Sequence, residues 1–221
     1  MPNPIKACIF DLDGVLVDTA KYHFTAWKRL AESLQVVFSE QDNEQLKGVS
    51  RADSLAYILQ KGNIQLDELA KLELMQTKND WYLELVATMH SDELLPNVTQ
   101  FLAELKEHKI LIGLGSSSKN AQLILDKTGI THYFDTVVDG RHTSNSKPHP
   151  EVFLKGAQNL NVLPSEVVVF EDAISGIAAA VTGGFYAIGL GDPLTLKQAH
   201  IVIPSLAKFN YSQLQLLFIS E

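Results

Sequence analysis

A chain of 221 residues, of which 46% are hydrophobic, can bury a full core, so the composition excludes an intrinsically disordered protein. The formal net charge of −8 argues against nucleic acid or an anionic membrane as a partner, because both attract basic surfaces. The single cysteine, Cys8, excludes a disulfide framework and a thiolate metal cluster, and we interpret it as a small buried core residue.

The first predicted element is a buried strand that ends in two carboxylates. Residues 5–10 are largely apolar, and Asp11 and Asp13 follow them at once. On an extended chain these two side chains would leave the same face, and Gly14 would allow a tight turn. One carboxylate could attack a substrate or bind a cation while the other moves a proton. An acidic turn that caps a helix is the alternative.

The next segment, from about residue 19 to residue 90, is predicted to be helical almost throughout, and nothing in it resembles a strand. Apolar residues recur there at helical spacing in three groups: Phe24, Trp27, Leu30, Ala31 and Leu34; Leu55, Ile58 and Leu59; and Leu69, Leu72 and Leu74.

From residue 97 onward, predicted helices and strands alternate. Strands are expected at residues 110–114, 136–138, 167–170 and 185–188, and helices around residues 101–105, 119–127, 151–160 and 174–181. This alternation is typical of a parallel sheet covered on both faces, and the first strand should join that sheet. We therefore predict an α/β fold with a Rossmann-like parallel sheet core, residues 1–17 and 92–221. A helical cap domain, residues 18–91, is inserted after the first strand.

Two observations bear on localisation. Residues 1–4 contain neither the basic region nor the apolar core of a signal peptide. Residues 173–191 carry no charge over nearly the length of a membrane helix, but Gly183 and Gly184 split them, so we expect helix, turn and strand. We expect a soluble, cytoplasmic protein that does not bind membranes or nucleic acid and acts as a monomer.

The candidate site follows from the residues that come after each predicted strand. In doubly wound sheets, ligands bind beyond the carboxyl ends of the strands, so these residues should converge. They are Asp11 and Asp13 after the first strand, Ser116–Ser118 after the second, Asp139 and Lys147 after the third, and Glu171–Asp172 after the fourth.

Each of these groups has a structural alternative when taken alone. Ser116–Ser118 could cap a helix, Lys147 could be a solvated loop lysine, and Glu171–Asp172 could cap the helix expected at residue 174. Their occurrence at four consecutive strand ends favours function instead.

The chemistry that these groups suit is phosphoryl transfer by an enzyme. Asp11, Glu171 and Asp172 supply the oxygen ligands that Mg²⁺ prefers. Ser116 and Lys147 would neutralise the remaining phosphoryl oxygens, since positioning and charge stabilisation dominate this reaction.

The four motifs in this order resemble those of the haloacid dehalogenase superfamily, and the resemblance covers essentially the whole chain. Dehalogenases proper lack the second aspartate, so Asp13 points to the Mg²⁺-dependent phosphotransferase branch. Within that branch the chain resembles the β-phosphoglucomutase family. The matching stretches are Asp11–Val15, Asp18–Ala20, Tyr22–Phe24, Ala26–Trp27, Leu46–Arg51, Lys78–Asn79, Ser116–Asn120, Lys147–Pro148 and Glu171–Asp172.

The resemblance implies a role for each matched residue. Asp11 would be the nucleophile that carries an aspartyl phosphate and, with Asp13, Glu171 and Asp172, would bind Mg²⁺. Asp13 would be the general acid/base, and Thr19 would lie near the hinge. The residues that would bind the hexose phosphate are His23, Trp27, Gly48, Val49, Ser50, Arg51, Ser54, Lys78, Ser116, Ser117, Ser118, Asn120 and Lys147.

Several of these residues keep a structural alternative. Arg51 and Lys78 could be exposed helix residues, and Trp27 fits the apolar stripe of the cap core. His23 could be a polar helix residue bonded to a neighbour. Ser117 departs from the family pattern, which has a small apolar residue there, and could tune the sugar pocket or the loop; His149 and the loop 140–146 also depart.

The predicted function is interconversion of β-D-glucose 1-phosphate and β-D-glucose 6-phosphate through β-glucose 1,6-bisphosphate. The alternative within the superfamily is a Mg²⁺-dependent sugar-phosphate phosphatase with the same nucleophile. A noncatalytic phospho-acceptor module is a third candidate, but such modules do not carry a long helical insertion after the first strand. The partners expected are small-molecule hexose phosphates.

Overall fold

The structure, a computed structural model, describes residues 5–219; residues 1–4, on which the prediction about a signal peptide depends, lie outside them. A six-stranded sheet forms the centre, in the order β3-β2-β1-β4-β5-β6, and all its pairings are parallel. The strands are β1 (Ala7–Phe10), β2 (Leu111–Gly115), β3 (Thr136–Val138), β4 (Val167–Glu171), β5 (Tyr186–Leu190) and β6 (Ile201–Ile203). The order reverses between β1 and β4, where doubly wound sheets bind ligands. The predicted α/β sheet is confirmed.

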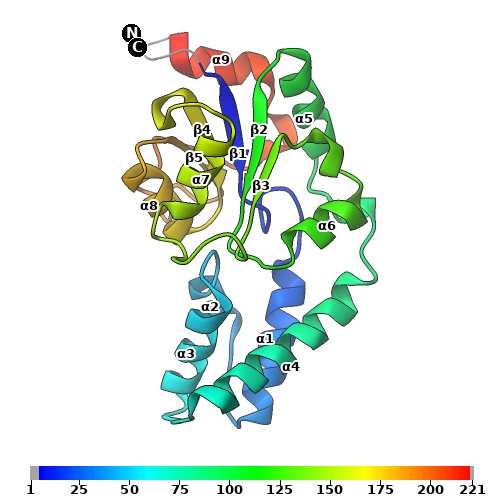
Figure 1. Ribbon diagram of the computed structural model, residues 1–221, viewed down its shortest axis with the longest axis vertical. Coiled ribbons are helices and arrows are strands. Elements are labelled where there is room, and N and C mark those ends of the chain that lie inside the picture. The colour runs from blue at the N-terminus through cyan, green and yellow to red at the C-terminus, as the bar shows by residue number, and fades with distance from the viewer. Residues whose placement is uncertain (1–4, 220–221) are drawn as a thin grey trace.

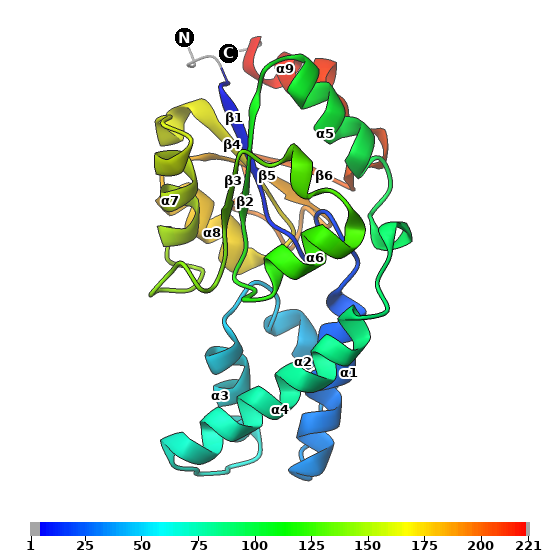
Figure 2. The same ribbon diagram turned by 45° about the vertical axis from the view of Figure 1, so that its right-hand side comes forward.

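Helices cover both faces of this sheet, as Figures 1 and 2 show. One face carries α5 (Val98–Glu107), α6 (Ala121–Thr128) and α9 (Tyr211–Ile219), and the other carries α7 (Glu151–Asn159) and α8 (Ile174–Thr182). Side chains of β1 alternate between the two, with Cys8 and Phe10 on the α5 side and Ala7 and Ile9 on the α7 side. All four are fully buried, which explains the unbroken apolar run in the sequence.

Four further helices lie beyond the carboxyl ends of the strands (Figure 1). They are α1 (Ala20–Ser33), α2 (Glu40–Gln45), α3 (Arg51–Lys61) and α4 (Glu68–Val86). The last three begin at side-chain N-caps, supplied by Ser39, Ser50 and Asp67. These helices have an apolar cluster of their own, which includes Trp27 and Leu55. We call them the cap; its boundaries at residues 18 and 91 stay a prediction.

Two elements near the C-terminus were not predicted. The strand β6 has only three residues, all half-buried, and α9 presents mixed apolar and polar residues without a clear stripe. Both pack at the margin of the fold, where buried and exposed residues do not alternate regularly. Hydrophobic periodicity therefore does not reveal them.

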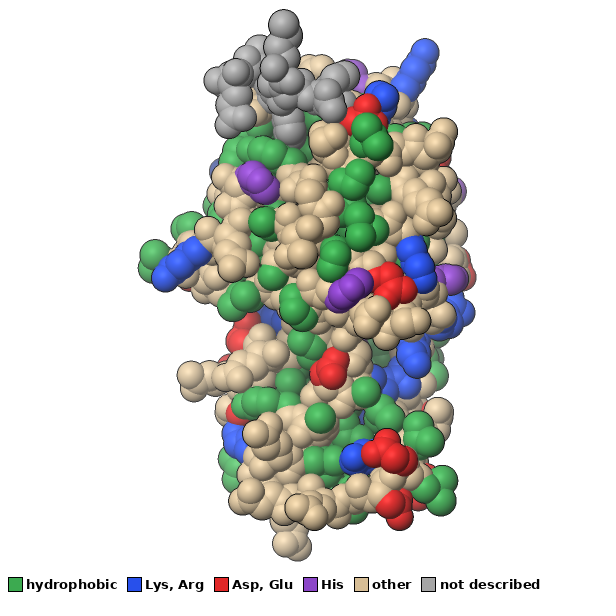
Figure 3. Space-filling view, turned by 60° about the vertical axis from the view of Figure 1, so that its left-hand side comes forward, with side chains coloured by type: hydrophobic (Ala, Val, Ile, Leu, Met, Phe, Trp, Pro, Cys, Tyr) green, Lys and Arg blue, Asp and Glu red, His purple; other side chains and the backbone are tan. Residues whose placement is uncertain are grey.

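Figure 3 shows basic and acidic side chains interspersed on one face of the molecule, without a continuous basic patch on that face. Within the described residues no helix is long and apolar enough to cross a membrane. Residues 173–191 form α8, a turn and β5, as predicted.

Candidate active site

A cavity of about 480 Å³ lies between the carboxyl edge of the sheet and the cap. Most of the predicted site residues line it: Asp11, Asp13, His23, Trp27, Gly48, Val49, Ser50, Arg51, Ser54, Lys78, Ser117, Ser118, Asn120, Lys147 and Asp172. Thr19, Ser116 and Glu171 are buried beside it and bond to residues of that lining or of the loops that carry it. Residues remote in sequence therefore meet at one place.

The floor of the cavity is built where β1 and β4 end side by side. Phe10 pairs with Phe170 in the sheet, so the next residues, Asp11 and Glu171, are neighbours. The fully buried ammonium of Lys147 lies 2.5 Å from Asp11 Oδ1 and 2.6 Å from Glu171 Oε1. Burial alone would lower the pKa of Lys147, but the two carboxylates raise it above its ordinary value, so the lysine stays charged.

The acids at this floor repel one another. Burial and the nearby Asp11 raise the pKa of Glu171 to about 7, against the opposing effect of Lys147. Burial, together with the charges of Glu171 and Asp11, holds the pKa of Asp172 well above its usual range. The ammonium groups of Lys147 and of Lys47, which lies 4.0 Å from Asp172 Oδ2, do not offset these effects, so a further cation would stabilise the ionised acids.

Two glycines allow the main chain to approach these carboxylates closely. A Cβ at Gly176 would collide with Glu171 Oε1, and a Cβ at Gly14 would collide with Asp172 Oδ2. Gly14 also has a φ of +82°, which side-chain-bearing residues rarely adopt. The turn after β1 and the start of α8 are thus shaped around the acids.

The donor set fits a divalent cation of the Mg²⁺ type. Within residues 5–219, no group of three or more His, Cys, Asp or Glu side chains is arranged as metal ligands. A site made from the carboxylates of Asp11 and Asp172 and the backbone carbonyl of Asp13 needs no third side chain, and hard oxygen donors are what Mg²⁺ prefers. The raised pKa values of Glu171 and Asp172 support this fit, because a bound cation would favour the ionised forms that burial and mutual repulsion disfavour.

A second network surrounds Asp13. The Thr19 hydroxyl donates a hydrogen bond to Asp13 Oδ1, and His23 Nε2 lies 3.8 Å from the same oxygen. Lys78 Nζ lies 3.0 Å from His23 Nδ1 on the opposite side of the ring. Burial and the charge of Asp11 raise the pKa of Asp13 to about 6. A carboxyl group that titrates near neutrality suits general acid/base chemistry.

The far end of the cavity joins the cap to the sheet. Arg51, at the start of α3, donates to Asn79 Oδ1 at 2.6 Å, and Asn120, at the start of α6, donates to the same oxygen at 2.9 Å. A guanidinium and an amide from opposite sides thus meet on one partner and could hold a phosphate. Asn79 was not predicted as a site residue, although it directly follows Lys78.

The structural alternatives for two motifs are wrong. The helix α6 begins at Ala121 with Asn120 as its N-cap, so Ser116–Ser118 do not cap it; the Ser116 hydroxyl accepts from the Ser118 backbone N–H at 3.1 Å. The helix α8 begins after Ala173 without a side-chain cap. Glu171 instead accepts from the Ala173 backbone N–H at 2.7 Å and contacts Lys147.

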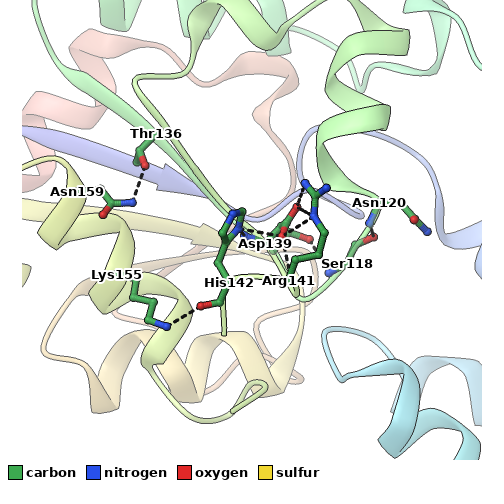
Figure 4. Close-up of polar contacts among 9 residues, drawn as sticks. Ser118, Asn120, Thr136, Asp139, Arg141, His142, Lys155 and Asn159 are labelled. Atoms are coloured by element: carbon green, nitrogen blue, oxygen red, sulfur yellow. Dashed lines mark hydrogen bonds and ion pairs between the residues drawn. The ribbon is translucent and has the colours of Figure 1, made fainter. Parts of the chain in front are cut away.

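The loop after β3 carries Lys147 to the floor and is fastened near its start (Figure 4). The buried carboxylate of Asp139 accepts from the Arg141 guanidinium at 2.7 Å and from the Arg141 backbone N–H at 2.9 Å. The His142 ring accepts from the Asp139 backbone N–H, and Lys155 donates to the His142 carbonyl at 2.6 Å. The Arg141 guanidinium is thus paired with Asp139, and these contacts hold the start of the loop that carries Lys147.

Comparisons with known proteins show the family to which the chain belongs. The sequence-family model of the haloacid dehalogenase-like hydrolases matches residues 5–184. The chain belongs to this family. It is therefore an enzyme, and its parallel sheet with helices is the haloacid dehalogenase-like fold.

Three relatives show which members of the family the chain resembles. It is 41% identical over 201 residues to the β-phosphoglucomutase of Bacillus subtilis (strain 168), covering 90% of this chain and 89% of that protein. The crystal structure of β-phosphoglucomutase from Clostridium difficile superimposes with a TM-score of 0.94 and 38% identity, covering 98% of this chain and 100% of the other. A phosphorylated carbohydrates phosphatase of Thermotoga maritima is 33% identical over 184 residues, which cover 81% of this chain and 82% of that protein.

Proposed function

We propose that the enzyme is a β-phosphoglucomutase, which interconverts β-D-glucose 1-phosphate and β-D-glucose 6-phosphate through β-glucose 1,6-bisphosphate. The observation that carries this proposal is that two separate groups of cationic and amide side chains, each suited to a phosphate, line one cavity. Lys147, beside Asp11, forms one group, and Arg51 and Asn120 form the other. A bisphosphate intermediate needs two such groups, and a monophosphate hydrolysis reaction needs only one. The resemblance to two β-phosphoglucomutases supports it further.

In this proposal Asp11 carries the phosphoryl group as an aspartyl phosphate. Lys147 and the Ser116 hydroxyl bind the phosphoryl oxygens during transfer. Asp13 takes the proton of the attacking sugar hydroxyl, which contributes about 10²–10⁴-fold to the rate for a positioned acid/base. The bisphosphate then turns so that its other phosphate faces Asp11 and returns to the enzyme.

The cap residues hold the sugar and the second phosphate. Arg51 offers its planar guanidinium to the phosphate that is not being transferred. This guanidinium is partly buried at the start of α3, where it bonds to Asn79. His23, with Lys78 behind it, lies beside Asp13 and keeps its proton network in place. A closed cap also excludes water from the aspartyl phosphate.

Mg²⁺ would be held by Asp11, Asp172 and the backbone carbonyl of Asp13. Glu171, which was also expected as a ligand, accepts from Lys147 with one oxygen and from the Ala173 backbone N–H with the other, so it would act on the site from beside it. When bound, Mg²⁺ supplies positive charge that neutralises the floor and the phosphoryl group.

A sugar-phosphate phosphatase is the second candidate, because the Thermotoga maritima relative is a phosphorylated carbohydrates phosphatase. It would use the same nucleophile, with water in place of the sugar hydroxyl.

A panel of anomerically defined hexose phosphates separates the two candidates. The protein is incubated with each compound, a trace of the matching bisphosphate and Mg²⁺, and the products are followed by phosphorus NMR. The proposal expects the 6-phosphate to accumulate from β-glucose 1-phosphate, with little inorganic phosphate. Inorganic phosphate as the main product would favour the phosphatase instead.

A further inference from the structure

Three serines from the sheet side of the molecule contact one short segment of the cap, residues 47–53. Ser117 Oγ donates to the Gly48 carbonyl at 2.9 Å, and Ser175 Oγ donates to the Lys47 carbonyl at 3.2 Å. Ser146 Oγ donates to Asp53 Oδ2 at 2.9 Å. The serines come from the loop after β2, from α8 and from the loop after β3, so three separate elements hold the same segment.

The cap segment also touches the sheet side through its main chain. Gly48 has a φ of +73°, and a Cβ there would lie 2.6 Å from Ser175 Oγ and 3.0 Å from Ala173 Cβ. Lys47 Nζ lies 4.0 Å from Asp172 Oδ2. The loop between α2 and α3 therefore reaches the carboxyl edge of the sheet, as Figures 1 and 2 show, next to the acids of the floor.

The hydroxyls of Ser117 and Ser175 have no other hydrogen-bond partner among the residues that the structure describes. Neither residue caps a helix, since Asn120 precedes α6 and Ala173 precedes α8. Their bonds go to main-chain carbonyls across the gap between cap and sheet, so they exist only while the cap is closed.

We propose that Ser117 and Ser175 are positioning residues that clasp the cap loop over Asp11 and so decide where the phosphoryl group goes. This inference rests on the proposed function. In productive transfer, the bond between Asp11 Oδ and phosphorus breaks, a bond from phosphorus to a sugar oxygen forms, and the sugar proton passes to Asp13. In the competing reaction a water oxygen takes the place of the sugar oxygen, its proton leaves in the same way, and inorganic phosphate is released.

When one of these hydrogen bonds is lost, the cap opens more often and water reaches the aspartyl phosphate more often. A neutral hydrogen bond of this kind shifts an equilibrium by about two- to tenfold, so each serine should change the open fraction of the cap by that factor. The two effects should multiply, because the hydroxyls bond to different carbonyls.

The test compares the wild type with Ser117→Ala, Ser175→Ala and the double variant. Each protein receives β-glucose 1-phosphate, a trace of β-glucose 1,6-bisphosphate and Mg²⁺, and phosphorus NMR gives the ratio of inorganic phosphate to isomer. The expected ratio rises about two- to tenfold in each single variant and by the product of the two in the double variant. Ser33→Ala is the control, because that hydroxyl bonds within its own cap helix. An unchanged ratio in the double variant would overturn the proposal.

A second readout needs no activity. Small-angle X-ray scattering of the same proteins without substrate reports the radius of gyration, which should increase from the wild type to the double variant. An equal radius in both would also overturn the proposal that the two serines hold the cap closed. If the wild type releases only phosphate, the proposed mutase function fails, and the scattering comparison still decides whether the two serines hold the cap.

Discussion

Lys78 is a cation buried in the cap at the expense of stability. Its side chain is 2% exposed, and its Nζ lies 4.6 Å and 4.8 Å from the ring centroids of Trp27 and Tyr82. Burial and the charge of Arg51 lower the pKa of Lys78 to about 7, from an ordinary value of 10.5. The folded protein therefore holds a charge that it disfavours, which is expected of a residue kept for its action on the substrate.

Replacing this lysine should stabilise the protein while impairing it. Below pH 7, Lys78 is charged in both the folded and the unfolded chain, so the whole desolvation penalty falls on the folded state. Lys78→Met should then raise the free energy of unfolding by about 1–3 kcal/mol. Between pH 7 and 10.5 the unfolded chain binds the extra proton, so wild-type stability rises with pH and the advantage of the variant shrinks.

Thermal unfolding at pH 6 and at pH 10 measures this difference. Lys71→Met, a partly exposed lysine of the same helix paired with Glu68, is the control and should change little at either pH. A Lys78→Met protein less stable than the wild type at pH 6 would contradict the account.

Asp13 is expected to move the proton rather than to hold the fold. Asp13→Asn keeps the shape of the side chain but removes the titrating group, so turnover should fall by about 10²–10⁴-fold. The circular dichroism spectrum should match that of the wild type, and the melting temperature at neutral pH should not fall, because burial disfavours the ionised carboxyl that the variant lacks. Near-normal turnover in this variant would remove Asp13 from the acid/base role.

The sequence reveals some of these residues and hides others. Asp11 and Glu171 could be predicted because Asp11 directly follows the buried strand β1, Glu171 ends the buried strand β4, and neighbouring parallel strands end together. Asn79 lies in a stretch that matches the family, but neither it nor Ser175 could be given a role. Each bonds to a partner across the gap between cap and sheet, Asn120 in one case and Lys47 in the other. No local pattern encodes such a contact.

At the scale of elements, α8 is built around the acid that precedes it. Gly176 lies in its first turn, and a Cβ there would meet the Glu171 carboxylate. Gly176→Ala should displace that carboxylate from Lys147 and lower turnover at least tenfold, although alanine itself favours a helix by about 1 kcal/mol. Steady-state kinetics with circular dichroism check this. Full activity with unchanged helix content would show that the close approach is not needed.

The strands that form the site are also those that the sequence defines best. β1 and β4 are buried on both faces, so each is an unbroken apolar run ended by acids. β6 is short and half-buried, and α9 lies against one side of the fold, so neither leaves a strong periodic signal. The elements most easily predicted are therefore the ones that carry the chemistry, because both properties follow from a central place in the sheet.

At the scale of the whole molecule, function depends on two bodies meeting over one cavity. The sheet side supplies Asp11, the proposed nucleophile, together with the buried lysine and the other acids, and the cap supplies Arg51, His23 and Lys78. The parallel sheet was predictable from the alternation of strands and helices, and the cap from its helical pattern. How tightly the cap meets the sheet was not, because it depends on single contacts such as that of Ser117 with Gly48.

The most direct test of the central claim follows the phosphoryl group itself. The enzyme is first phosphorylated with β-glucose 1,6-bisphosphate in the presence of Mg²⁺, and the modified residue is located by mass spectrometry of acid-quenched peptides. β-Glucose 1-phosphate is then added. The account predicts one phosphoryl group on Asp11, which the sugar phosphate removes as bisphosphate much faster than water removes it. A phosphoryl group on another residue, or one lost only as inorganic phosphate whether or not sugar is present, would contradict it.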